Sequence, residues 1–233
     1  MAKKKNDGAM LERNIGAIFD CDGVVIDSAH MWRKTESELA HRAGTPLSPE
    51  HQHAIISMTI DEVGVYLHRE IQLGESPQDV VHMINDLMTD FYRTQSTPMP
   101  GVLPFLGELN RLGVHMCVVS SSPALFLELG LKHVGAYDYF CKVFSVDDFN
   151  TSKRSPFIYE HALETMGTSP ENTWGFEDSY YACQTMNNLG ICSIGIYDPV
   201  EPYEVEELRA NCSLMISDFA QLDPCMIAAG PHA

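Results

Sequence analysis

The sequence has few basic residues, no long apolar run and no clustered cysteines. It contains 15 Lys and Arg against 32 Asp and Glu, a formal net charge of −17 at pH 7. Because such a surface repels nucleic acid phosphates, we expect no nucleic-acid partner. No segment approaches the roughly 20 apolar residues that span a membrane. The basic amino terminus, MAKKKNDGAM, also lacks the apolar stretch of a secretory signal. We therefore expect a cytoplasmic protein without a membrane partner.

The seven cysteines are an odd number, and no two of them have C-x-x-C spacing. Most of them lie within apolar stretches, which is typical of buried, reduced thiols. We expect neither a disulfide framework nor a zinc site. The 233 residues, 45% of them hydrophobic, can bury the core of one large domain or of a domain with a smaller insertion.

Short apolar runs alternate with helical patterns over most of the chain. Four runs predict buried strands, at 15–19, 114–119, 173–176 and 191–196. Helical patterns lie between the later runs, and one of them has Ser155 as N-cap, Pro156 at its first position and Gly167 at its end. This alternation predicts an α/β fold with a Rossmann-like, mainly parallel sheet, whose ligand site lies at the carboxyl ends of the strands.

Residues 29–97 have a different pattern, without strand-like runs. Helices are predicted from Met31 to Arg42, from Thr59 to about Gln72, and from residue 77 to about 93. Thr59 and Glu62 have the spacing of a capping box. We therefore expect a small all-helical domain at 29–97, inserted after the first strand of a core formed by residues 1–28 and 98–233.

Polar side chains of the types that phosphoryl transfer needs follow the ends of three predicted strands. They are Asp20 and Asp22 after the first strand, Ser120 at the end of the second, and Glu177 and Asp178 after the third, with Lys153 in the loop before a later helix. Because the carboxyl ends of parallel strands meet at one edge of the sheet, we expect these side chains to form one site.

This arrangement resembles the four motifs of the haloacid dehalogenase superfamily of phosphatases and phosphomutases. The motifs occur in the family's order as DCDGVVIDS at 20–28, VVSSS at 118–122, Lys153 in SKRSPFIYE, and GFEDS at 175–179. The resemblance covers nearly the whole chain and is to the branch of phosphatases and β-phosphoglucomutase-like enzymes. The insertion at 29–97 is similar to the helical C1-type cap, which in that family closes over the substrate.

The resemblance implies a role for each acidic residue. Asp20 would attack phosphorus and carry an aspartyl-phosphate, and Asp22 would protonate the leaving group and then activate water. Mg²⁺ prefers oxygen ligands. The expected ligands are Asp20, Asp22, which contributes its backbone carbonyl, Asp178 and Glu177, and the sequence leaves open which of the last two contacts the ion directly.

The resemblance also implies a phosphate-binding set and a contact from the cap. Ser120 and Ser121, with backbone N–H groups at the start of the next helix, would bind phosphate oxygens, and Lys153 would balance their charge. Arg154 follows Lys153 where the family usually has proline, so whether Arg154 shares the role of Lys153 stays open. Trp32 is the candidate substrate-facing residue of the cap.

The expected function is a Mg²⁺-dependent phosphatase for a small phosphorylated metabolite, such as a sugar phosphate or a phosphoglycolate-like compound, acting as a monomer or weak homodimer. A dehalogenase needs neither a metal nor an acid for its leaving group, so the acidic residues argue against it. A phospho-receiver-like signalling or binding protein is about half as long and lacks an acid–base partner at the position of Asp22. An enzyme that lost its activity would not keep the complete set.

A phosphomutase of the same family is the remaining alternative. Its cap carries a His, an Arg and a Lys that bind the second phosphate of a bisphosphate intermediate. By residue count these positions fall on Trp32, about Ile60 and near Met88. None of the three is cationic, so the sequence favours hydrolysis over transfer of the phosphoryl group back to the sugar.

Overall fold

A computed structural model describes residues 14–55, 58–198 and 205–232. The core of this part of the chain is a six-stranded sheet with the order β5-β4-β1-β6-β7-β8, and its neighbouring strands all pair in parallel. The strands are β1 (Gly16–Phe19), β4 (His115–Ser120), β5 (Lys142–Ser145), β6 (Thr173–Glu177), β7 (Cys192–Ile196) and β8 (Leu214–Ile216). The predicted α/β fold with a mainly parallel sheet is confirmed. The sequence did not predict β5 and β8.

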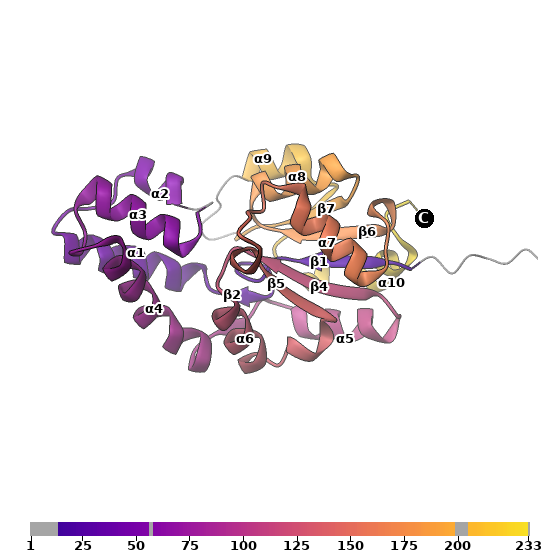
Figure 1. Ribbon diagram of the computed structural model, residues 1–233. Helices are drawn as coiled ribbons and strands as arrows, with labels where there is room; N and C mark the ends of the chain where they lie inside the picture. The colour runs from indigo at the N-terminus through magenta and orange to yellow at the C-terminus, as the bar shows by residue number, and fades with distance from the viewer. Residues whose placement is uncertain (1–13, 56–57, 199–204, 233) are drawn as a thin grey trace, which may run out of the picture.

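Helices cover both faces of this sheet (Figure 1). They are α5 (Val102–Arg111), α6 (Ala124–His133), α7 (Pro156–Met166), α8 (Tyr180–Leu189), α9 (Val205–Asn211) and α10 (Pro224–Ala229). Short 3₁₀ turns lie at Tyr137–Tyr139, Val146–Phe149, Pro170–Asn172 and Phe219–Gln221. Side chains of β1 alternate between two hydrophobic clusters: Phe19 belongs to the cluster under α5 and α6, and Ile18 to the cluster under α7 and α8. The sheet is therefore buried on both faces.

Within the described ranges, four helices lie between the first and second strands of the large sheet and form a separate group at one end of the molecule (Figure 1). They are α1 (Ala29–Ala43), α2 (Pro49–Ile55), α3 (Ile60–Ile71) and α4 (Pro77–Thr94). The predicted capping box at the start of α3 is confirmed, with Thr59 accepting from the Glu62 backbone and Glu62 accepting from the Thr59 backbone. The short helix α2 was not predicted.

The chain enters and leaves this helical group through two short antiparallel strands, β2 (Ile26–Asp27) and β3 (Thr97–Pro98). The backbone N–H of Met99 also donates to the carbonyl of Val25 at 3.0 Å. Because both crossings lie side by side, we propose 29–97 as the cap and the flanking residues as the core. In the part of the chain that the structure describes, no helix is long and apolar enough to cross a membrane.

Candidate active site

Asp20 directly follows the central strand β1 and is almost completely buried. Its backbone N–H donates to the carbonyl of Phe176 at 2.9 Å, which fixes the end of β1 against β6. The Nζ of Lys153 lies 2.7 Å from Oδ1 of Asp20 as an ion pair. Burial, reinforced by the negative charge of Glu177, raises the pKa of Asp20 to about 7, although Lys153 opposes the shift. The protein environment therefore disfavours the charge on Asp20 until further positive charge is supplied.

Lys153 is buried between two carboxylates. Besides Asp20, its Nζ contacts Oε1 of Glu177 at 2.5 Å. Burial alone would lower the pKa of Lys153, but Asp20 and Glu177 outweigh burial and raise it well above its usual value. Arg154, in contrast, is exposed, and its guanidinium lies 4.4 Å from the ring centroid of Tyr181. Lys153, and not Arg154, is thus the cation that contacts Asp20.

Glu177 also holds the turn that leads into α8. Its Oε2 accepts the backbone N–H groups of Asp178 at 2.7 Å and Ser179 at 3.2 Å. With Oε1 on Lys153, both oxygens of Glu177 have partners inside the protein. In Asp178, Oδ1 accepts from the Ser179 hydroxyl at 3.1 Å, and Oδ2 faces the backbone at Gly23. Asp178 therefore has more ligand capacity left than Glu177.

Asp20, Glu177 and Asp178 form an acidic cluster in which one oxygen of each lies within 4.8 Å of the others. Burial, Glu177 and Asp20 raise the pKa of Asp178 well above its usual value. Two buried carboxylates and one partly buried carboxylate face a single lysine, so a cation among them would relieve the excess of negative charge. Their oxygens suit a hard divalent ion. The cluster can thus hold a metal, as the sequence predicted for these three residues.

The side chain of Asp22 is not part of this cluster and has a different environment. Three hydroxyl groups donate to it: those of Ser28 at 2.6 Å and Tyr92 at 2.5 Å to Oδ1, and that of Ser122 at 2.6 Å to Oδ2. Burial and the charge of Asp20 raise the pKa of Asp22, and the three hydrogen bonds oppose the shift. Sequence reasoning missed all three contacts. Ser28 and Ser122 stand in the quoted runs DCDGVVIDS and VVSSS, whereas nothing in the sequence pointed to Tyr92.

The serine run at the carboxyl end of β4 lies beside the strand that carries Asp20. Ser120 is buried, and its hydroxyl accepts the backbone N–H of Ser122 at 3.2 Å. Ser121 follows at the edge of the sheet and is half-buried. The hydroxyl of Ser145, at the end of β5, donates to the Ser122 carbonyl at 2.8 Å. The structure therefore brings the predicted residues of all four motifs to one edge of the sheet.

A family model for haloacid dehalogenase-like hydrolases matches residues 17–196, most of the chain and every residue of the site. The chain belongs to this family. It is therefore a hydrolase, and phosphatases are among its relatives.

Individual relatives of this haloacid dehalogenase-like hydrolase are distant but match three quarters or more of its length. Hexitol phosphatase B of Escherichia coli O157:H7 is 26% identical over 86% of this chain and 91% of its own. A phosphoglycolate phosphatase of Rhodobacter capsulatus is 28% identical over 75% of this chain and 80% of its own. The structure of a β-phosphoglucomutase from Clostridium difficile superposes with a TM-score of 0.74 at 19% identity, over 92% of this chain and 95% of that one. This last similarity shows the shared fold.

In the cap of this hydrolase, the three positions taken from the phosphomutase comparison differ in exposure. Trp32 on α1 is partly buried and packs against the main hydrophobic cluster. Ile60 and Met88 are buried within the same cluster, and the hydroxyl of Thr35 donates to the Met88 sulfur at 3.1 Å. Ile60 and Met88 therefore serve the packing of the cap. Trp32 stays a prediction as a substrate-facing residue.

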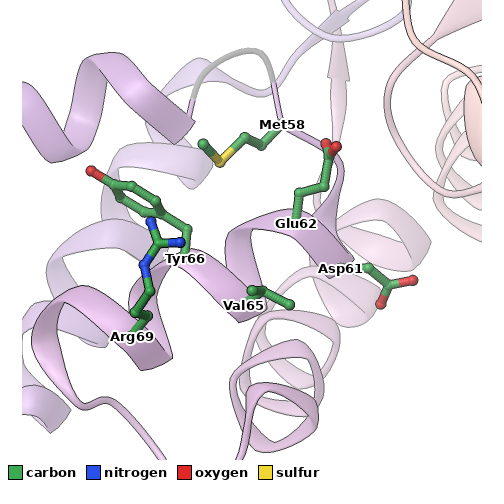
Figure 2. A pocket seen from close by; sticks show the side chains of 6 residues that line it. All are labelled: Met58, Asp61, Glu62, Val65, Tyr66 and Arg69. Atoms are coloured by element: carbon green, nitrogen blue, oxygen red, sulfur yellow. The ribbon is translucent and has the colours of Figure 1, made fainter.

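A pocket with a volume of about 380 Å³ lies along one side of α3 in the cap. It is lined by Met58, Asp61, Glu62, Val65, Tyr66 and Arg69 (Figure 2). The negative charges of Asp61 and Glu62 also affect the pKa of Asp147. Asp147 follows β5 at the edge of the sheet where the site lies. Burial, Asp61, Asp148 and Glu62 together raise the pKa of Asp147. Acidic groups of the cap and the core thus lie near each other at this edge.

Proposed function

We propose that this hydrolase is a Mg²⁺-dependent phosphatase that cleaves a small phosphorylated sugar or polyol through an aspartyl-phosphate on Asp20. One observation carries the proposal: two aspartates, two residues apart, the first buried and the second partly buried, have opposite kinds of partner. Asp20 contacts a lysine and the acidic cluster, whereas the side chain of Asp22 accepts hydrogen bonds from three hydroxyl groups. A nucleophile needs the first environment, and a group that exchanges a proton needs the second.

In the first half of the proposed reaction, an oxygen of Asp20 forms a bond to phosphorus while the bond from phosphorus to the leaving oxygen breaks. Asp22 gives its proton to that leaving oxygen. In the second half, Asp22 takes a proton from water, the water oxygen attacks phosphorus, and the Asp20 carboxylate leaves with its electron pair. Free phosphate and the regenerated enzyme result.

The surrounding residues would bind and orient the phosphoryl group. Ser120 and Ser121 are proposed to donate to its oxygens, and Lys153 to hold Asp20 in place and balance its charge. The proposed metal ligands are Asp20, the backbone carbonyl of Asp22, and Asp178, with Glu177 as a further candidate. Asp178 is the better direct ligand because Glu177 already uses both oxygens on Lys153 and the α8 turn. A bound Mg²⁺ would neutralise charge between Asp20 and the phosphate oxygens.

Acidic groups on α3 and after β5 favour an uncharged leaving group. The relatives include a hexitol phosphatase and a phosphoglycolate phosphatase, whose names imply a neutral polyol and a carboxylate. Asp61, Glu62 and Asp147 would repel a carboxylate or a second phosphate, but they can accept hydrogen bonds from sugar hydroxyls. We therefore propose hexose or hexitol phosphates over phosphoglycolate.

The test is phosphate release from a panel of hexose phosphates, hexitol phosphates and phosphoglycolate, with Mg²⁺ and with excess EDTA. We expect release that depends on Mg²⁺ and a higher kcat/KM for the polyol esters. Full activity in EDTA would contradict the metal requirement, and a preference for phosphoglycolate would contradict the leaving-group argument. A parallel incubation with β-glucose 1-phosphate and a trace of its bisphosphate tests the phosphomutase alternative. If glucose 6-phosphate forms faster than free phosphate, the enzyme is a phosphomutase and the proposed phosphatase activity is wrong.

A further inference from the structure

Tyr92 reaches Asp22 from outside the four motifs. It lies on α4, the last helix of the cap, 70 positions along the chain from Asp22. The side chain is fully buried, and its hydroxyl donates to Oδ1 of Asp22 at 2.5 Å. Burial and the neighbouring Asp22 carboxylate raise the pKa of Tyr92 well above its usual value. The phenol therefore keeps its proton and acts as a hydrogen-bond donor.

The ring of Tyr92 is held on the core side of the cap. It stacks on Phe126 of α6 with ring centroids 4.9 Å apart, and the edge of Phe91 meets it at 5.2 Å. The backbone of α6 approaches the ring closely at Gly130, where an added Cβ would lie 2.8 Å from Cδ1 of Tyr92. Because the ring is packed against the core helix α6, its hydroxyl has a fixed position relative to the core.

Ser122 contacts the other carboxylate oxygen of Asp22. Its hydroxyl donates to Oδ2 of Asp22 at 2.6 Å, and its carbonyl accepts from Ser145 on the neighbouring strand at 2.8 Å. Tyr92, from a cap helix, thus shares Oδ1 of Asp22 with Ser28, and Ser122, from the end of β4, holds Oδ2. Two donors on different oxygens fix the rotation of a carboxyl group, which one donor cannot do.

We infer that Tyr92 and Ser122 are positioning residues that hold Asp22 in the orientation from which it transfers its proton. The inference rests on the proposed function, in which Asp22 protonates the leaving oxygen. Tyr92, a residue of the cap, would then affect the proton-transfer step itself and not only the choice of substrate. Loss of either hydroxyl should leave substrate binding unchanged but misplace the carboxyl group of Asp22 relative to the leaving oxygen.

The consequence depends on how much the leaving group needs an acid. An alkoxide from a sugar phosphate is a poor leaving group and requires protonation, whereas p-nitrophenolate leaves without it. We expect Tyr92→Phe to lower kcat/KM for a hexose phosphate by about tenfold, part of the roughly 10² to 10⁴-fold that a general acid supplies. For p-nitrophenyl phosphate the change should stay within about threefold. Ser122→Ala should show the same pattern.

The experiment measures kcat/KM over a series of aryl and alkyl phosphates for the wild type, Tyr92→Phe, Ser122→Ala and Asp22→Asn. Tyr139→Phe is the matched control, because it removes the hydroxyl of a partly buried tyrosine that packs near Gly107 of α5. Thermal melting checks the fold of each variant. In the double variant Asp22→Asn/Tyr92→Phe, the tyrosine change should have no further effect on the hexose phosphate, because Tyr92 acts through Asp22.

The outcomes separate this inference from the proposed function. If Asp22→Asn affects good and poor leaving groups equally, the proposed role of Asp22 is wrong. If Asp22→Asn is selective but folded Tyr92→Phe and Ser122→Ala resemble wild type, the positioning inference is overturned. An equal loss on every substrate in Tyr92→Phe would indicate a structural role and would also overturn it. If Tyr92→Phe fails to fold, Ser122→Ala decides between selective loss and no loss.

Discussion

Replacing Gly23 with alanine should disable the metal site through a single methyl group. Gly23 lies between Asp22 and the strand β2, with φ at +73°, a conformation that residues other than glycine rarely adopt. A Cβ built at Gly23 would overlap Oδ2 of Asp178. The change therefore combines backbone strain with a collision at the proposed metal ligand, and the two effects can be measured separately.

The strain is the smaller effect. An alanine held in the left-handed region costs roughly 1–2 kcal/mol. The collision is more specific, because Oδ2 must retreat by roughly half an ångström or more to regain an allowed contact, whereas Mg²⁺ demands near-ideal octahedral geometry. Displaced groups around a metal site typically cost about 10 to 100-fold in metal affinity. We expect Gly23→Ala to weaken Mg²⁺ binding by at least about tenfold.

Gly135→Ala is the matched control. Gly135 has φ at +76°, almost the same as Gly23, but its added Cβ would meet nothing within 4 Å. This variant has the same backbone strain without touching Asp178. Chemical denaturation in EDTA should show a loss in the free energy of unfolding from strain alone in Gly135→Ala, and a loss at least as large in Gly23→Ala. Calorimetric Mg²⁺ titration, with phosphate release measured in parallel, should show weakened binding in Gly23→Ala alone.

The reasoning fails if folded Gly23→Ala binds Mg²⁺ as tightly as the Gly135→Ala control. Such a result would mean that Asp178 does not contact the ion from the position seen here. Equal weakening in both variants would also contradict it, because the loss would then follow from strain and not from the collision.

The other predictions concern the nucleophile, the metal ligand and pH. Asp20→Asn should abolish turnover while keeping the melting temperature within a few degrees, since it removes the nucleophile at nearly constant volume; turnover within tenfold of wild type would contradict the assignment. Asp178→Ala should raise the Mg²⁺ concentration needed for half-maximal phosphate release, and an unchanged requirement would exclude it as a ligand. Because the pKa of Asp20 is raised to about 7, the folded protein binds a proton that the unfolded chain releases near pH 4, so stability should fall as pH rises through 7. In EDTA, the melting temperature should therefore be lower at pH 8 than at pH 5.5, and Mg²⁺ should reduce this difference. A higher melting temperature at pH 8 would contradict the prediction.

The strands that the sequence predicted share one property: they bury nearly whole runs of side chains. The strands β1, β4, β6 and β7 are apolar on both faces, so each appears as a continuous hydrophobic run. Strand β5 begins at exposed Lys142 and β8 at exposed Leu214. These two strands lie at the edges of the sheet, where burial is incomplete and the hydrophobic run is too short to recognise. The helix α2 is likewise short and contains two histidines.

The site was predictable wherever its residues follow strands. Asp20, Ser120 and Glu177 stand at carboxyl ends, and parallel pairing brings such ends together whatever the loops between them. Tyr92 follows no strand, and only the packing of α4 on α6 brings its hydroxyl to Asp22. The sequence also could not show which of Glu177 and Asp178 is the better candidate ligand. The answer depends on which carboxylate oxygens already accept hydrogen bonds in the turn before α8.

Two aspartates in one short loop would ordinarily behave alike, since they share burial and repel each other. Their partners make them different. The partner of Asp20 is the Lys153 ammonium, which opposes the rise of the Asp20 pKa to about 7 and, together with a metal ion in the acidic cluster, would favour the carboxylate that attacks phosphorus. The partners of Asp22 are neutral hydroxyls, which can each donate to a carboxylate or accept from a carboxylic acid, so both protonation states keep hydrogen bonds. Environments that separate paired carboxyls in this way indicate which one is the nucleophile and which one transfers the proton.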